Sequence, residues 1–308
     1  MLSRTAQNLY WMGRYIERAD ATARLVEMGR RMAMLPSANA EWRSVARASG
    51  CAADLAEAAS VTDREIIHRL VLDADNRSSI RCCIAQTRAN AKAIRTALTA
   101  DMWEALNDHW RLLETLDGDE VIAELPIWLD WAKQRAAAFR GAAETSLLRN
   151  DGYLFLRIGE LIERAEMTLR LLDVKYYVLL PETDVVGGGR DFHQWTSVLR
   201  ATSALRAYHH VNRGDYTPWG IAEFLVLNRQ FPRSAAYCFR QLDRRLGELG
   251  QIYGGERFAC HDTAAEMVAR LDRCDIHTLF QSGLHEFIGE AIEATNRLST
   301  EIAAAYHF

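Results

Sequence analysis

Two copies of one motif stand out in this sequence: residues 13–25 read GRYIERADATARL and residues 159–171 read GELIERAEMTLRL. Ile, Glu, Arg, Ala, an acidic residue, Thr, Arg and Leu recur at matching positions, about half of the 308-residue chain apart. A repeat of this quality predicts two related helical halves. We expect the two motif helices to pack against each other near the centre, related by a pseudo-twofold axis. Gly13 and Gly159 should then lie at close helix crossings.

The spacing of the motif places its polar residues on one face of a helix. Residues three and four apart share a face, and Gly13, Glu17, Asp20 and Arg24 are separated by four, three and four positions. The second copy repeats this face. A glycine inside a helix costs about 1 kcal/mol relative to alanine, which the close approach of another helix would explain. A second, apolar face is expected to point to the core. It comprises Leu9, Met12, Ile16, Ala19, Ala23 and Val26.

The charged residues of the two copies are the first candidates for a functional site. They are Glu17, Arg18, Asp20, Arg24, Glu163, Arg164, Glu166 and Arg170. One interpretation is a solvated face whose surface ion pairs contribute only a few tenths of a kcal/mol each. The other is a buried or cleft-lining polar cluster, which the repetition with a glycine in each copy favours. The sequence leaves both interpretations open and assigns no catalytic residue.

Composition and charge describe an ordinary globular protein with a sizeable core. The chain is 49% hydrophobic and 25% charged, with a net charge of −4 and a pI near 6.2. No basic field is present that would recruit nucleic acid. No apolar run approaches the ~20 residues of a membrane span, and the first residues predict an amphipathic helix rather than a signal core. We expect a soluble, cytoplasmic protein with neither nucleic acid nor membrane as a partner.

The helical signals run through the whole chain and predict an all-α bundle of roughly ten to twelve helices. The first motif helix should run from Ser3 to about Met34, and the second from Asn150 to about Leu180. Nowhere does a convincing alternating strand pattern occur. We expect a single domain, residues 1–308, with pseudo-halves of about 1–149 and 150–308. The glycine-rich segment 181–190 should be an exposed loop that connects the halves.

Metal and cofactor signatures are incomplete. A di-iron bundle requires two Glu-x-x-His motifs, and only Glu65 and His68 have that spacing. Cys260-His261 with Cys274 and His277 has the residue types of a zinc site, but neighbouring residues on a helix point about 100° apart. We therefore expect no metal and no cofactor. The six cysteines are interpreted as small apolar residues on helices.

Two arginine-containing segments could bind an anion. Residues 187–190, GGGR, could cradle a phosphate with backbone N–H groups, although a flexible connector is favoured because no strand precedes them. Arg229 and Arg233 flank a helix break at Phe231-Pro232. They could grip a carboxylate or phosphate, and they could equally tie two helices together by capping carbonyls.

Four segments resemble the bacterial Alpha-E family, an all-helical domain named for its Glu-Arg motif. Residues 2–19 resemble its opening, LSRxAxxLYWxGRYxERA, and residues 156–176 resemble its central motif. Residues 101–107 (DMWEALN) and 224–234 (FLVLNRQFPRS) fit the same family. The resemblance covers essentially the whole chain. One departure is Glu160, where the second copy of the motif often has arginine.

The resemblance implies a setting rather than a reaction. Members of the family are typically encoded with, or fused to, a circularly permuted ATP-grasp protein, often near a transglutaminase-like peptidase. ATP-grasp ligases couple a carboxylate to an amine through an acyl phosphate. The leading hypothesis is a helical accessory or substrate-binding component of such an amide-ligase system, binding the ligase or a peptide or amino-acid-like substrate. One alternative is an enzyme in its own right with Glu17 and Glu163 as acid-base groups. The other is a structural helical scaffold.

Overall fold

The computed structural model describes residues 1–34, 39–57, 60–107, 110, 113, 117–177 and 188–308, and within these ranges the chain is helical without a strand. The helices of the first half are α1 (Ser3–Met32), α2 (Asn39–Ser49), α3 (Ala53–Glu57), α4 (Asp63–Val71), α5 (Ile80–Ala93), α6 (Ala100–Asn107), α8 (Gly118–Ala123) and α9 (Leu125–Ser146). Those of the second half are α10 (Asp151–Tyr177), α11 (Gly189–Ala201), α12 (Leu205–Asn212), α13 (Pro218–Leu227), α14 (Ala235–Ile252), α15 (Ala259–Arg273), α16 (Ile276–Ser282) and α17 (Leu284–Ala305).

The described helices outnumber the expected ten to twelve, in part because a residue with positive φ interrupts each of three helical stretches. Gly50 (φ +72°) ends α2, Ser203 (φ +57°) separates α11 from α12, and Gly283 (φ +105°) separates α16 from α17. A right-handed helix cannot continue through such a conformation. A serine with positive φ carries no clear sequence signal, so helical periodicity alone does not separate α11 from α12.

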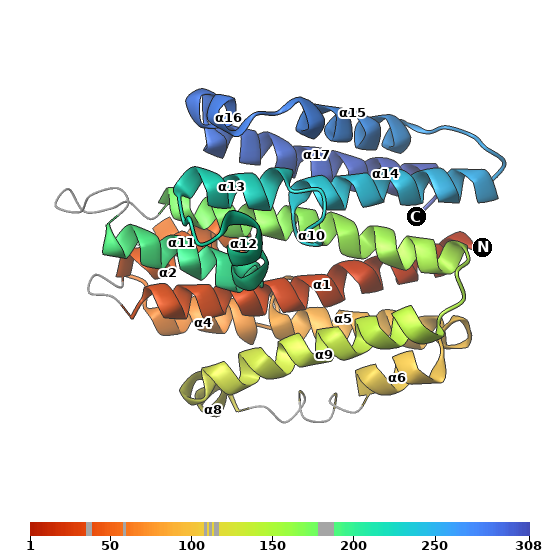
Figure 1. Ribbon diagram of the computed structural model, residues 1–308. Coiled ribbons are helices and arrows are strands. Elements are labelled where there is room, and N and C mark those ends of the chain that lie inside the picture. The colour runs from red at the N-terminus through yellow and green to blue at the C-terminus, as the bar shows by residue number, and fades with distance from the viewer. Residues whose placement is uncertain (35–38, 58–59, 108–109, 111–112, 114–116, 178–187) are drawn as a thin grey trace.

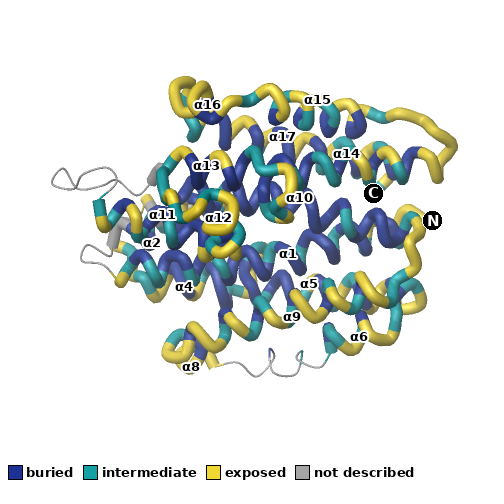
Figure 2. The backbone as a smooth tube through the Cα atoms, in the orientation of Figure 1, coloured by how far each residue is buried: buried dark blue, intermediate teal, exposed yellow. Residues whose placement is uncertain are grey.

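Helices α1 and α10 form the centre of the molecule and run side by side in the same direction (Figure 1). Both are largely buried along their length, whereas the outer helices expose one face (Figure 2). The predicted apolar face of α1 is confirmed, since each of its six residues is at most 1% exposed.

The two motif glycines lie where the helices cross. A Cβ added to Gly13 would stand 2.2 Å from the carbonyl oxygen of Leu156, and one added to Gly159 would stand 2.1 Å from that of Tyr10. Real Cβ atoms do not approach backbone oxygens so closely, so alanine at either position would push the helices apart. The predicted close crossing at both glycines is therefore confirmed.

The other helices are arranged around this pair in two equivalent sets, one from each half of the chain. In each half, a helix that follows the motif helix packs more closely on the opposite motif helix: α2 on α10, and α11 on α1. Arg170 on α10 donates to the carbonyl oxygen of Ala48 at the end of α2 (3.4 Å), and Arg24 on α1 donates to that of Ala201 at the end of α11 (3.3 Å). Helices α5 and α9 flank α1 as α14 and α17 flank α10 (Figure 1).

The repeat extends to the turns that begin α5 and α14. Ser79 caps α5 by accepting from the N–H of Cys82 (3.1 Å), and Ser234 caps α14 by accepting from the N–H of Tyr237 (3.1 Å). Four residues after each cap a buried cysteine follows, Cys83 or Cys238. The residue before each cap differs: it is Ser78 in the first half and Arg233 in the second.

Most of the predicted loop at 181–190 lies outside the described residues. Within the described part, Gly188 precedes α11, and Gly189 and Arg190 form its first turn. No described helix combines the length and apolarity that crossing a membrane requires.

Candidate functional site

Two reciprocal ion pairs join α1 to α10 where the motif copies meet. Arg164 donates from Nε and Nη2 to the two carboxylate oxygens of Glu17, at 2.9 and 2.8 Å. Arg18 donates in the same way to Glu163, at 2.6 and 2.8 Å. A twofold relation produces such contacts, because each motif arginine meets the glutamate of the other copy. The two glutamates are buried, so this face of the motif is a buried cluster and not a solvated surface.

The first cluster is the set of four guanidinium groups around Glu17 and Asp20. The four belong to Arg24, Arg140, Arg164 and Arg233. Arg233 bridges the two carboxylates, donating to Oε1 of Glu17 at 3.0 Å and to Oδ2 of Asp20 at 2.6 Å. Arg140 on α9 also bridges them, at 3.0 and 3.3 Å. Three parts of the chain that are distant in sequence therefore meet at these two carboxylates.

The second cluster is the equivalent set around Glu163 and Glu166, and it holds three guanidinium groups. Besides Arg18, Arg14 bridges the carboxylates, donating to Oε2 of Glu163 at 2.6 Å and to Oε2 of Glu166 at 3.2 Å. Arg170 donates to Oε1 of Glu166 from Nε and Nη2, at 3.0 and 2.9 Å. All eight charged residues predicted from the motif thus lie in one of the two clusters.

The bridging arginine reaches the two clusters from different helices. Arg14 and Glu160 occupy the same motif position, and Arg140 and Ser299 lie at matching positions of α9 and α17. In the second cluster Arg14 comes from the motif helix and donates to the Oγ of Ser299 at 3.0 Å. In the first cluster the motif position holds an acid, and Arg140 supplies the guanidinium instead. The departure at Glu160 is thus compensated by Arg140 of α9, which lies 123 positions after Glu17 in the chain.

The arginines of the clusters keep Glu17 and Glu163 ionised. Burial by itself would raise the pKa of Glu163, but Arg18 and Arg14 outweigh it and hold that pKa at about 2. Burial acts on Glu17 in the same direction, and its arginines hold the pKa well below the ordinary value. Glu160 differs: it is fully buried beside Arg157, and burial raises its pKa.

A hollow opens against the second cluster. It has a volume of about 110 Å³, and its walls include Arg18, Ser78, Glu163, Glu166 and Arg170. Its rim reaches the surface at Gly50, which is exposed. A Cβ at Gly50 would stand 2.5 Å from Nη1 of Arg170, so the glycine keeps this side of the hollow free.

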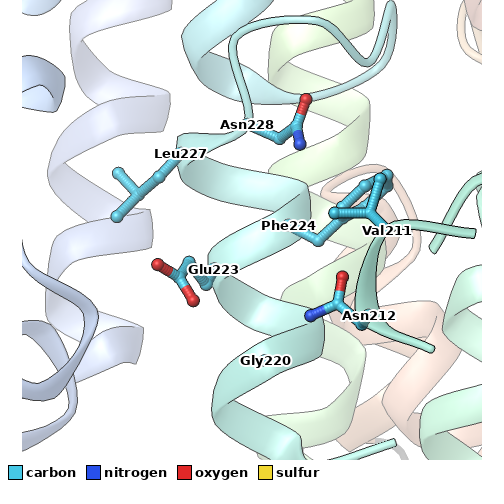
Figure 3. A pocket seen from close by; sticks show the side chains of 7 residues that line it. All are labelled: Val211, Asn212, Gly220, Glu223, Phe224, Leu227 and Asn228. Atoms are coloured by element: carbon cyan, nitrogen blue, oxygen red, sulfur yellow. The ribbon is translucent and has the colours of Figure 1, made fainter. Parts of the chain in front are cut away.

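Besides a hollow of about 430 Å³ beside α4 and α8, two others in the described part of the chain also lie away from the clusters. One, of about 250 Å³, lies between α12 and α13, where the amides of Asn212 and Asn228 stand on either side of Phe224 (Figure 3). The other, of about 350 Å³, lies beside α10 and α17 and is mostly apolar. The His285–Asp173 pair, 2.6 Å apart, lies at its wall. Neither contains the buried carboxylate pairs of the motif.

The other candidate residues are distributed differently from the sequence expectation. Arg229 and Arg233 do not share a site: Arg229 pairs with Asp272 at the surface (3.0 Å), whereas Arg233 enters the first cluster. Glu65 completes a capping box with Thr62 at the start of α4. Among the described residues, no group of three or more His, Cys, Asp or Glu side chains could hold a metal ion.

Sequence reasoning missed two residues of the clusters, Arg14 and Arg140, and one residue that lines the hollow, Ser78. Arg14 follows the motif glycine directly and lies three residues before Glu17, so its helical spacing was a usable signal. Arg140 is one of two arginines in an alanine-rich helix, and Ser78 is an ordinary residue before an N-cap. Nothing in their local sequence connects them to the motif, because tertiary packing alone brings them there.

Comparison with known proteins gives a family and distant relatives. The model of the Alpha-E family, described as "a predicted alpha-helical domain with a conserved ER motif", matches residues 1–307. Uncharacterized proteins of Mycobacterium bovis and of two strains of Mycobacterium tuberculosis are 24% identical over 277 residues. The match covers 82% of this chain but only 30% of each relative. No solved structure shows significant similarity.

Proposed function

The chain belongs to the Alpha-E family, and we propose that it is the helical substrate-binding component of an amide-ligase system driven by an ATP-grasp protein. The partner in this proposal comes from the family resemblance. The length of the relatives is compatible with it, since 70% of each relative lies outside the part that this chain matches. The binding role comes from the site.

The hollow against the second cluster is the observation that supports a binding role. Each cluster has two carboxylates three residues apart and a reciprocal arginine from the other motif copy, but only the first also holds Arg233. A purely structural cluster gains from being filled, because a buried charge is stabilised by partners on every side. An accessible hollow beside two buried carboxylates instead leaves room for a ligand, which disfavours the scaffold alternative.

The electrostatics disfavour the alternative in which this chain is an acid-base enzyme. A general acid must carry a proton near neutral pH, and a general base works best with a pKa near the working pH. The pKa values of Glu163 and Glu17 are lowered, to about 2 for Glu163. Both side chains are therefore ionised and held by arginines, which suits the recognition of a ligand better than proton transfer.

The test is reconstitution with a circularly permuted ATP-grasp protein from the same genome, the partner that the family resemblance implies. Amide product formed from ATP and the cell's small-molecule extract is measured by mass spectrometry, with and without this chain. We expect product to depend on the chain and to fall at least tenfold with Ser78→Arg, which would place a guanidinium in the hollow as Arg233 does in the first cluster.

Gly247→Arg is the matched control. Gly247 is exposed on α14, with no atom within 4 Å of an added Cβ, so it adds the same charge away from both clusters. It should leave product formation unchanged. Equal product with and without the wild-type chain, at saturating ATP-grasp protein, would refute the proposed role.

A further inference from the structure

We infer that the hollow of the second cluster binds a guanidinium group, in the position equivalent to that of the Arg233 guanidinium in the first cluster. This deepens the proposed function and rests on it, because it names the chemistry of the substrate: an arginine side chain, free or within a peptide.

The first cluster shows how its carboxylate pair receives a guanidinium. Arg233 places Nη1 at 3.0 Å from Oε1 of Glu17 and Nη2 at 2.6 Å from Oδ2 of Asp20. One planar group thus joins two carboxylates that lie three residues apart on one helix. Such fork-like donation is specific to guanidinium, since an ammonium group is a point charge without fixed paired donors.

The turn that delivers Arg233 has a counterpart without the side chain. Arg233 directly precedes Ser234, the cap of α14, and Ser78 directly precedes Ser79, the cap of α5. The Oγ of Ser78 lies 3.5 Å from Nη1 of Arg18 and borders the hollow. The short serine side chain therefore leaves open the space that a guanidinium fills in the other half.

The carboxylate oxygens of the second cluster have free acceptor positions for the hydrogen bonds of a guanidinium. Oε1 of Glu17 accepts from both Arg164 and Arg233, whereas Oε1 of Glu163 accepts, among the described residues, from Arg18 alone. A carboxylate oxygen has two lone pairs, so one acceptor position remains on Glu163.

Glu166 has the same free capacity. Oδ2 of Asp20 accepts from Arg140 and Arg233, whereas Oε2 of Glu166 accepts, within the described part of the chain, from Arg14 alone. The two less occupied oxygens belong to the two carboxylates that line the hollow. They form the pair that a guanidinium would bridge.

Stoichiometry and size agree with this occupant. A guanidinium in the hollow would give the second cluster four guanidinium groups around two carboxylates, which is the ratio that the first cluster already has. Arg18 and Arg170 also line the hollow, so the acceptor oxygens of Glu163 and Glu166, and not the net charge, distinguish a guanidinium from other occupants. The volume of about 110 Å³ is several times the ~10–15 Å³ that one water needs, so the space admits a small functional group.

The first experiment measures ligand binding to the purified full chain by calorimetry. The probes are free arginine, Nα-acetyl-arginine amide and Nα-acetyl-citrulline amide, the last being a neutral isostere of the second. We expect saturable binding of an arginine probe and at least a tenfold weaker affinity for citrulline. Binding of both arginine probes indicates recognition of the side chain alone; preference for the amide indicates arginine within a peptide, and preference for the free amino acid indicates free arginine.

Variants locate the binding. Ser78→Arg should abolish arginine binding while retaining the wild-type melting temperature or raising it, and Gly247→Arg should bind as the wild type does. In the first cluster, Arg233→Ala should lower the melting temperature, and millimolar methylguanidine should restore part of that loss but not part of the loss in Gly159→Ala.

Equal binding of arginine and citrulline, no binding of any probe, or unchanged binding in Ser78→Arg would overturn the inference. These failures are distinct from failure of the proposed function. If amide formation is lost in Ser78→Arg but no arginine probe binds, the inference of guanidinium binding fails and the proposed function is retained. Arginine binding without any effect on amide formation would contradict the ligase role.

Discussion

Alanine at Glu17 or Arg164 tests whether the reciprocal pairs hold the two motif helices together. Glu17→Ala leaves the buried Arg164 with Glu160 as its remaining carboxylate, 3.9 Å away. Removing one partner of a buried pair costs about 3–5 kcal/mol, and we expect the upper part of that range here. Arg164→Ala should cost about 3 kcal/mol, because Glu17 retains Arg140 and Arg233.

The double variant should cost less than the sum of the single changes by about 1–3 kcal/mol, because no charge is then left without its partner. Urea unfolding followed by circular dichroism measures these differences, provided that the slope with urea stays constant. The control cycle pairs Glu17→Ala with Arg18→Ala, which are adjacent in sequence but belong to different clusters. Its costs should add to within about 0.5 kcal/mol. Additivity for Glu17 and Arg164, or equal coupling in the control, would refute the assignment of pairs.

Three further predictions address acid stability, the helix crossing and the buried thiols. The folded-state pKa of Glu163, about 2, lies below its ordinary 4.5, so its stabilisation is present above about pH 4.5 and is lost as the pH falls towards 2, roughly 3 kcal/mol in all. Urea midpoints from pH 6 to 2.5 should show a steeper loss for the wild type than for Glu163→Gln; parallel losses would contradict this. Gly159→Ala should reduce the free energy of unfolding by about 1–3 kcal/mol or more and so lower the melting temperature. Gly141→Ala, where an added Cβ meets open space, should raise the melting temperature slightly, and equal effects of the two changes would count against the close crossing. Burial raises the pKa of the Cys238 thiol to about 12 and that of Cys83 still higher, so iodoacetamide at pH 8 should modify neither before unfolding; rapid modification of either would show that its surroundings open.

Much of the central packing could be predicted because it follows from local spacing. A polar face with a glycine one turn before a glutamate, present twice, is a local pattern, and it correctly predicted the crossing at Gly13 and Gly159. The eight motif charges were also predicted as a group. Their pairing between the two helices was not predicted, because Glu17 meets Arg164 and not its own neighbour Arg18. Which partner a side chain meets depends on the offset between two helices, which neither helix encodes alone.

The sequence by itself determined that this chain is all-helical, belongs to the Alpha-E family and is built on two copies of one helix. These properties depend on residues three and four positions apart, and such spacing is visible along the chain. Only the tertiary structure decided that Arg140 and Arg233 complete the first cluster and that Ser78 leaves the second one open. The physical reason is that a cluster of charges is satisfied in space, by whichever helix brings a guanidinium within about 3 Å, irrespective of its distance in sequence.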